Sequence, residues 1–253
     1  MGETRVDLAI EGARAAITFR ADSGLVVLSA AVMEQLGVRA AEVAAASDVR
    51  VTVLASEGKA FAAGADVKSM AGASAQKARA YGELGQRVIS ALEALPSITI
   101  AAIHGAALGG GCELALGCDF RIAVKDAKIG LPEVTLGIVP GWSGIIRLTK
   151  LIGPARAKRM YLGGAPVSGE EALHLGLVDE VVETVEELPA RIDAFCRSFS
   201  RSSPAGVRLA KRVSRDGDDL SAFAESFTTD DSREGIAAFM EKRPAAWMKK
   251  GKA

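Results

Sequence analysis

Gly109-Gly110-Gly111-Cys112-Glu113 is the stretch that decides the fold of this chain. It lies between an apolar run, Ile98 to Ile103, and residues of helical composition. A glycine-rich turn that opens a helix leaves main-chain N–H groups without intrahelical partners, so it can bind an oxygen that becomes negative during a reaction. Glu113 adds a carboxylate in the first turn of that helix. The stretch therefore predicts a strand–turn–helix unit that carries chemistry.

A second glycine turn, Ala62-Ala63-Gly64-Ala65-Asp66, has the same character and can donate a second N–H. Further along, Glu133 follows Pro132, whose ring fixes the local backbone direction. Two backbone donors and two carboxylates together indicate acid–base chemistry on a carbonyl compound.

The composition narrows the class of protein. With 253 residues and 49% hydrophobic content, the chain can bury a large core as one domain or as one domain with an appendage. Thirty-one basic residues balance thirty-one acidic ones, so no overall field points to nucleic acid or to an anionic membrane. Any phosphorylated ligand must be held by local groups.

The few cysteines and histidines exclude several kinds of site. Three cysteines, at positions 112, 118 and 196, have no CxxC spacing, which fits free, mostly buried thiols in a reducing compartment. The two histidines, His104 and His174, lie in no HExxH or Cys/His cluster, so a zinc site and a Ser-His-Asp triad lack parts. We expect no metal, and we expect His104 to be a hydrogen-bonded core residue rather than a base.

The chain carries no pattern typical of export or membrane insertion. Met1 to Arg14 carries charges at Glu3, Arg5, Asp7 and Glu11, and no apolar core of signal-peptide length. The uncharged residues 94–112 are interrupted by proline, polar residues and glycines, so a buried strand, a loop and a helix start explain them better than a membrane span. A cytoplasmic location is the expectation.

Hydrophobic periodicity predicts an α/β core with a helical C-terminal appendage, divided at 1–186 and 187–253. Predicted strands are Val6–Glu11, Ala15–Arg20, Val49–Leu54, Ile98–Ile103, Phe120–Val124 and Leu177–Val182. Predicted helices are Ala30–Ala46, Ser74–Ala94, Cys112–Gly117, Gly141–Ile152, one that begins at Pro154, one that Ser168 caps and Gly176 ends, and a largely helical tail from about Glu187.

These motifs, in this order and spacing, resemble the enoyl-CoA hydratase/isomerase (crotonase) superfamily. The resemblance is carried by both glycine turns, by Pro132-Glu133 and by Gly137-Ile138-Val139-Pro140-Gly141. It extends through Glu171-Ala172 and Gly176-Leu177-Val178 to the tail motif Phe239-Met240-Glu241-Lys242-Arg243. The resemblance implies a crotonase-like spiral of ββα units, homotrimers that often stack as homohexamers, and an acyl-CoA thioester substrate. It implies no cofactor, since coenzyme A is part of the substrate.

The resemblance also implies roles for individual residues. Ala65 and Gly110 would donate their N–H groups to the thioester carbonyl oxygen. Glu113 would take a proton from water, and Glu133 would deliver one to Cα, in a syn addition that needs no metal. Because two nearby carboxylates in a dry pocket repel, one should hold or share a proton near neutral pH. The predicted substrate-binding residues are Ala63, Ala65, Asp66, Val67, Lys68, Gly110 and Trp142.

Some of these residues also have purely structural interpretations. Asp66 is assigned mainly to capping the helix that follows it, and Lys68 is a candidate surface charge. Trp142 is either a core aromatic residue or a wall of the acyl pocket. Gly141-Trp142-Ser143-Gly144 is like a nucleophile elbow, but Ile145 replaces the last glycine, so Ser143 is a candidate helix cap and not a nucleophile.

Two segments depart from the family pattern. Leu25-Val26-Val27-Leu28-Ser29 stands where the family usually has Lys/Arg-x-Asn-Ala-Leu, so a basic contact to coenzyme A is missing there. Trp142-Ser143-Gly144-Ile145-Ile146-Arg147 replaces a run of small residues, glycine, threonine and glutamine. A large indole at this place favours a short or unusually shaped acyl group.

Three functions remain open at this point. The first is hydration of 2-enoyl-CoA, as in fatty-acid β-oxidation, which the presence of both carboxylates favours. The second is another reaction of the same enolate, such as double-bond isomerisation, for which Glu133 alone would suffice. The third is a non-catalytic role as an RNA-binding or structural oligomer, which the balanced charge and the lack of an aromatic-basic run disfavour.

Overall fold

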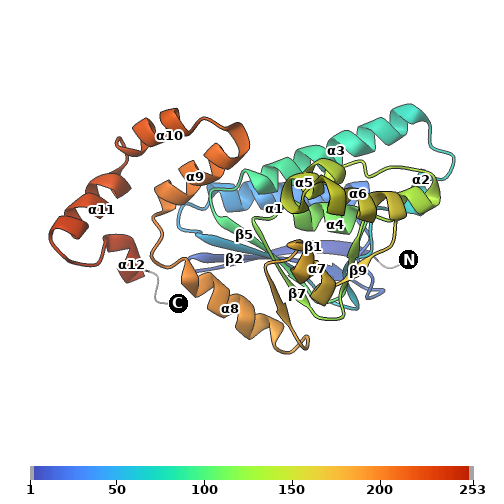
Figure 1. Ribbon diagram of the computed structural model, residues 1–253, viewed down its shortest axis with the longest axis horizontal. Helices are drawn as coiled ribbons and strands as arrows, with labels where there is room; N and C mark the ends of the chain where they lie inside the picture. The colour runs from blue at the N-terminus through green and yellow to red at the C-terminus, as the bar shows by residue number, and fades with distance from the viewer. Residues whose placement is uncertain (1–2, 251–253) are drawn as a thin grey trace.

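The computed structural model describes residues 3–250, and the two N-terminal and three C-terminal residues lie outside this range. Two sheets form the centre of the molecule (Figure 1). The larger has the strand order β1-β2-β3-β5-β7-β10, and the smaller has the order β4-β6-β8-β9. In the large sheet β1 and β2 are antiparallel, whereas the strands from β2 to β10 pair in parallel.

The strands of the large sheet are β1 (Thr4–Glu11), β2 (Arg14–Ala21), β3 (Val51–Ser56), β5 (Ile98–Ile103), β7 (Phe120–Val124) and β10 (Glu180–Val182). Those of the small sheet are β4 (Ala60–Ala62), β6 (Ala106–Leu108), β8 (Lys128–Gly130) and β9 (Val167–Ser168). The chain alternates between the sheets: β3 leads into β4, β5 into β6 and β7 into β8, with a helical segment after each pair. This repeat is the predicted spiral of ββα units, and the fold class is confirmed.

Twelve α-helices and one 3₁₀ helix occur in the described chain. Those of the α/β body are α1 (Ala30–Ala45), α2 (Val67–Met70), α3 (Ala75–Glu93), α4 (Gly110–Leu116), η1 (Glu133–Leu136), α5 (Gly144–Ile152), α6 (Pro154–Gly163) and α7 (Gly169–Leu175). The C-terminal helices are α8 (Leu188–Ser198), α9 (Pro204–Asp216), α10 (Asp219–Ser226), α11 (Asp230–Met240) and α12 (Ala246–Lys250).

Two hydrophobic clusters hold these layers together. The larger packs α1, α3 and α4 against one face of the large sheet, with Phe19, Met33, Ile89 and Ile103 fully buried. The smaller lies on the other face, where Leu188 and Ile192 of α8 cover Ile100 and its neighbours. Helices α9 to α12 extend from the body on the side away from the N-terminus (Figure 1). The division at residues 186 and 187 stays a prediction.

Most predicted boundaries agree with the structure, and the differences have physical reasons. Strands β5 and β7 have the predicted bounds, because each is a largely buried segment that pairs with a strand on both sides. The strand predicted over Leu177–Val182 begins only at Glu180, since Leu177 and Val178 are buried in the turn after α7. Helix α5 starts at Gly144 and not at Gly141.

Two single-residue predictions were wrong. Ser143 does not cap α5: its φ is 69°, in the left-handed region, and its side chain makes no capping bond. His104 is half-buried and not a core residue, although its Nε2 does lie 3.1 Å from the Gly58 carbonyl. The free thiols are as expected, with Cys112 and Cys118 buried and Cys196 half-buried.

Candidate active site

The candidate site lies where the strands of the small sheet end. Strands β4, β6 and β8 run parallel, so their carboxyl ends meet at one edge. The chain leaves β4 towards Ala65, β6 towards Gly110 and β8 towards Glu133. The fold thereby brings both glycine turns and both glutamates together. In the sequence, Ala65 and Glu133 are 68 positions apart (133 − 65 = 68).

The two glycine turns are in direct contact. A Cβ on Gly111 would lie 2.2 Å from the Ala62 carbonyl oxygen, and one on Gly64 would lie 3.1 Å from that of Leu108. The first approach leaves no room for a side chain, and the second is tight for one. Gly109 and Gly64 also have positive φ values, 52° and 121°, which favour glycine for a second reason.

Each turn includes a predicted donor whose N–H group has no protein acceptor among residues 3–250. Gly110 is the first residue of α4, so its N–H has no intrahelical partner. Ala65 accepts a hydrogen bond from Val67 N at 2.9 Å, but its own N–H donates to none. Two such donors on neighbouring turns can bind one developing oxyanion.

The segment at 25–29, which departs from the family pattern, supports the first turn. Val26 O accepts from Ala63 N, and Leu28 N donates to Gly64 O, both at 2.9 Å. Val26 and Leu28 are fully buried. This segment therefore holds the Ala65 turn through its backbone and its apolar side chains.

Glu113 is buried, with only 2% of its surface exposed. Its Oε1 accepts from Trp142 N and from Gly144 N, both at 2.8 Å, at the start of α5. A Cβ on Gly144 would lie 2.6 Å from Glu113 Cγ, so glycine is required there. The carboxylate is thus fixed by two backbone donors from a turn that follows it by about thirty positions.

Glu133 begins the 3₁₀ helix η1 and points back to the triple glycine. A Cβ on Gly109 would lie 2.9 Å from Glu133 Oε1. The other carboxyl oxygen, Glu133 Oε2, is buried and has no hydrogen-bond partner within residues 3–250. A buried carboxyl oxygen without a partner costs free energy, so it is either protonated or ready to bind a polar ligand.

Burial raises the pKa of Glu113 to about 7, although the N–H groups of Gly144 and Trp142 oppose this rise. The nearby Glu133 raises the pKa of Glu113 further, and Arg147 lowers it. Burial also raises the pKa of Glu133. These directions agree with a proton held by the pair near neutral pH, but the main cause is desolvation and repulsion is secondary.

Trp142 packs directly beside Gly110. Its side chain is buried, and a Cβ on Gly110 would lie 2.4 Å from the ring. A Cβ on Gly85 of α3 would lie 2.1 Å from the indole nitrogen on the other side. Trp142 Nε1 donates to Tyr81 O at 3.3 Å, and the two rings meet edge to face with centroids 5.3 Å apart.

The remaining predicted binding residues form one short segment after β4. Asp66 Oδ1 accepts from Ser69 N at 3.3 Å, so Asp66 caps α2 as expected. Val67 and Lys68 are exposed on α2, and Ala63 is half-buried. They lie beside the Ala65 donor, where a ligand bound to Ala65 N could reach them.

Sequence reasoning missed four residues that build this site: Tyr81, Gly85, Gly144 and Arg147. Tyr81 donates its hydroxyl to the Leu28 carbonyl, which ties α3 to the Ala65 turn. A glycine inside a helical pattern, as at Gly85, signals a close approach. Nothing in the sequence indicates that the partner is the indole of Trp142.

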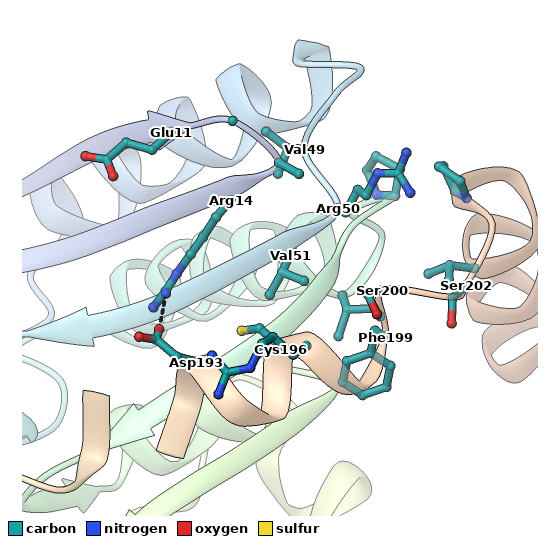
Figure 2. Close-up of a pocket in the computed structure, with 17 residues that line it drawn as sticks. Glu11, Arg14, Val49, Arg50, Val51, Asp193, Cys196, Phe199, Ser200 and Ser202 are labelled. Carbon is teal, nitrogen blue, oxygen red and sulfur yellow. Dashed lines mark hydrogen bonds and ion pairs between the residues drawn. The ribbon is translucent and has the colours of Figure 1, made fainter. Parts of the chain in front are cut away.

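A separate cavity of about 510 Å³ lies at the amino ends of β3 and β5, beside α8 (Figure 2). Val51 and Phe199 form part of its apolar lining, and Arg14 and Asp193 form an ion pair at its edge. No predicted site residue lines it. Neither carboxylate faces this cavity, so we place the chemistry at the carboxyl ends of the small sheet.

No group of three or more His, Cys, Asp or Glu side chains in the described residues could hold a metal ion. Within the same part of the chain, no helix combines the length and apolar character needed to cross a membrane.

Comparison with known proteins agrees with this geometry. The family described as Enoyl-CoA hydratase/isomerase matches residues 10–250. The chain belongs to this family. A curated relative, the crotonyl-CoA hydratase of Syntrophomonas wolfei, is 44% identical over 202 residues, which cover 76% of this chain and 77% of the relative.

Two further family members show that the similarity extends along most of the chain. The short-chain-enoyl-CoA hydratase of Clostridium acetobutylicum is 36% identical over 244 residues, covering 92% of this chain and 93% of the relative. The crystal structure of an enoyl-CoA hydratase from Bacillus anthracis superposes with a TM-score of 0.87 at 35% identity, covering 95% of this chain and 98% of that one. The crotonase-like fold is therefore established by sequence and by structure.

Proposed function

We propose that this chain is a 2-enoyl-CoA hydratase, a hydro-lyase that adds water across the α,β double bond of an enoyl thioester. The observation that carries the proposal is the placement of Glu113 and Glu133 at the same sheet edge as the free N–H groups of Ala65 and Gly110. Relatives named crotonyl-CoA hydratase and short-chain-enoyl-CoA hydratase support it.

In the proposed reaction, Ala65 N and Gly110 N bind the thioester carbonyl oxygen and stabilise the enolate. Each donor of this kind contributes about 3 kcal/mol to the transition state. Glu113, as carboxylate, takes a proton from water as the water oxygen bonds to Cβ. Glu133, as carboxylic acid, gives its proton to Cα, so protons balance over the addition. The buried Oε2 of Glu133, which has no hydrogen-bond partner within residues 3–250, supports the role of acid.

The first experiment is hydration of crotonyl-CoA, followed by loss of the conjugated thioester absorbance. We expect Glu133→Gln and Glu113→Gln each to lower kcat by about 10²- to 10⁴-fold, the usual contribution of a general acid or base. Glu171→Gln, which changes an exposed carboxyl on α7, is the control and should keep full activity. Formation of conjugated product from a 3-enoyl-CoA, without hydration, would instead support isomerisation.

We also propose a preference for short acyl chains. The Trp142 ring fills the space between Gly85 and Gly110, so the thioester has no room for a long chain on that side. Rates measured from crotonyl-CoA to dodecenoyl-CoA should fall with length, and Trp142→Leu should reduce that fall. The variant keeps the backbone N–H that holds Glu113. An unchanged length profile would show that the acyl chain leaves the site elsewhere.

Assembly into a homotrimer or homohexamer is a further proposal. Helices α10 and α11, with the turn after α10, expose large apolar side chains in this protomer, namely Leu220, Phe223, Phe227, Ile236, Phe239 and Met240. Exposed apolar patches of this kind mark interaction sites. Light scattering should give a mass of three or six protomers. The cytoplasmic location and the absence of nucleic-acid partners also stay proposals, testable by cell fractionation and by an RNA mobility assay.

A further inference from the structure

The turn that holds Glu113 is itself held by a half-buried ion pair. Arg147 Nη1 donates to the Trp142 carbonyl at 2.7 Å. Its Nε and Nη2 donate to the two carboxylate oxygens of Glu93, the last residue of α3, at 3.2 and 2.9 Å. The Arg147 side chain is 12% exposed and that of Glu93 is 34% exposed. A guanidinium that binds a carboxylate with two donors has a fixed orientation.

We propose that Arg147 is a positioning residue for the Glu113 carboxylate, and that Glu93 fixes Arg147 in that role. The proposed reaction would use this arrangement, and the inference rests on the proposed function for its effect on rate. The ion pair lies outside the set of groups that would touch the substrate or the water. It acts through the backbone of Trp142.

The backbone geometry explains why an external support is needed. Trp142 donates its N–H to Glu113 and accepts from Arg147 with its carbonyl, so Arg147 fixes the peptide next to the donor. Ser143 follows with a φ of 69°, a left-handed conformation that is unfavourable for a residue with a side chain. A strained turn keeps its shape only where its surroundings determine it.

Helix α3 supplies the other supports of this turn. Gln86 Nε2 donates to the Gly141 carbonyl at 2.9 Å, and the Tyr81 carbonyl accepts from the Trp142 indole. Neither contact carries a charge. The Arg147–Glu93 pair is therefore the charged link between α3 and the turn that holds Glu113.

The charges around Glu113 give the inference a measurable consequence. Glu133 of η1, Tyr81 of α3 and Cys112 of α4 are the other titratable groups that interact electrostatically with Glu113. Among the groups that act on the pKa of Glu113, Arg147 is the positive one, and it lowers that pKa. Loss of the guanidinium should therefore raise the pKa of Glu113.

The test compares Arg147→Gln, Arg147→Lys and Glu93→Gln with the wild type. The readouts are the pH profile of kcat for crotonyl-CoA and a ¹³C NMR titration of the Glu113 carboxyl, assigned with Glu113→Gln. We expect Arg147→Gln to lower kcat about tenfold to hundredfold, with little change in KM, and to move the ionisation of Glu113 to higher pH. Arg147→Lys keeps the positive charge, so the pKa of Glu113 should stay at its wild-type value. The kcat of this variant should fall less than that of Arg147→Gln.

Glu93→Gln separates charge from position. It leaves Arg147 positive but loosely held, so kcat should fall without an upward shift of the Glu113 pKa. If Arg147→Gln leaves that pKa unchanged and lowers only the melting temperature, Arg147 is merely structural and the inference is wrong. If Arg147→Gln does not fold, the Arg147→Lys and Glu93→Gln variants decide, because the inference requires a kcat loss in both. If the wild type hydrates no enoyl-CoA, the proposed function fails, while the titration, which needs no substrate, still decides whether Arg147 acts on the Glu113 carboxyl.

Discussion

Glu113 is a buried ionisable residue, so its protonation makes the stability of the fold depend on pH. The folded protein raises its pKa to about 7, mainly through burial, whereas an unfolded chain has a glutamate pKa near 4.3. The folded state therefore binds the proton more tightly over this pH range. Its stability should fall as the pH rises from about 4.3 to 7 and then level off.

Glu113→Gln tests this pH dependence of stability. The amide oxygen can still accept from Trp142 N and Gly144 N, but the side chain no longer ionises. At pH 8 the variant should be more stable than the wild type by an amount on the order of 3 kcal/mol, from the pKa difference. At pH 5 most of that gain should disappear. Urea unfolding at both pH values measures it, and an equal difference at pH 5 and pH 8 would contradict the assignment.

Two glycines in the same turn, Gly144 and Gly141, provide a matched pair of variants that test whether the exact position of the Glu113 carboxylate matters. A Cβ at Gly144 would meet Glu113 Cγ at 2.6 Å, whereas one at Gly141 would meet nothing within 4 Å. Gly144→Ala should displace the carboxylate and lower kcat by about a hundredfold. Gly141→Ala should keep the wild-type rate. Kinetics with crotonyl-CoA and a thermal melt of each variant distinguish displacement from unfolding, and similar rates for both would exclude a precise role for Glu113.

The elements differ in how well the sequence predicts them. Strand β5 is a continuous apolar run, so its local sequence determines it. Strands β4, β6 and β8 have three residues each and no usable periodicity, and they form because they pair with one another. The glycine turns and glutamates are predictable as motifs. Their meeting at one sheet edge, and the support from Tyr81 and Arg147, depend on contacts between distant segments.

Helix α9 is joined to the large sheet by a partly buried ion pair. Lys211 Nζ donates to Asp119 Oδ2 at 2.5 Å and to the Ser97 carbonyl at 2.7 Å. The Lys211 side chain is 11% exposed, and that of Asp119 is 25% exposed. Lys211→Met would leave the Asp119 charge without this partner and should cost about 2–3 kcal/mol.

The exposed pair Arg79–Glu83, 3.6 Å apart on α3, is the control for this element. Arg79→Met should cost no more than about 0.5 kcal/mol, because water screens an exposed pair. Urea unfolding of both variants gives the comparison. Addition of Asp119→Asn to Lys211→Met should recover part of the loss, and equal costs for the two single variants would show that the α9 contact is no stronger than a surface pair.

Helices α10 and α11 carry a concentration of exposed large apolar side chains, and this concentration supports assembly. Phe239 on α11 is 83% exposed, so it contributes almost nothing to packing within the protomer. Val38 on α1 is also exposed, at 54%, but belongs to the α/β body. If α10 and α11 bind a second copy, a charge at Phe239 would be buried without a partner in that interface, at a cost of several kcal/mol.

Phe239→Asp should therefore dissociate the assembly into folded protomers, whereas Val38→Asp should leave the assembly intact. Light scattering measures the mass, and circular dichroism checks that each variant is folded. Because each protomer holds its own two carboxylates and two N–H donors, the isolated protomer should still bind the thioester. If Phe239→Asp keeps the mass of the wild type, the interface lies elsewhere, and the exposed side chains of α5 and α6, such as Ile146 and Leu162, become the next surface to alter.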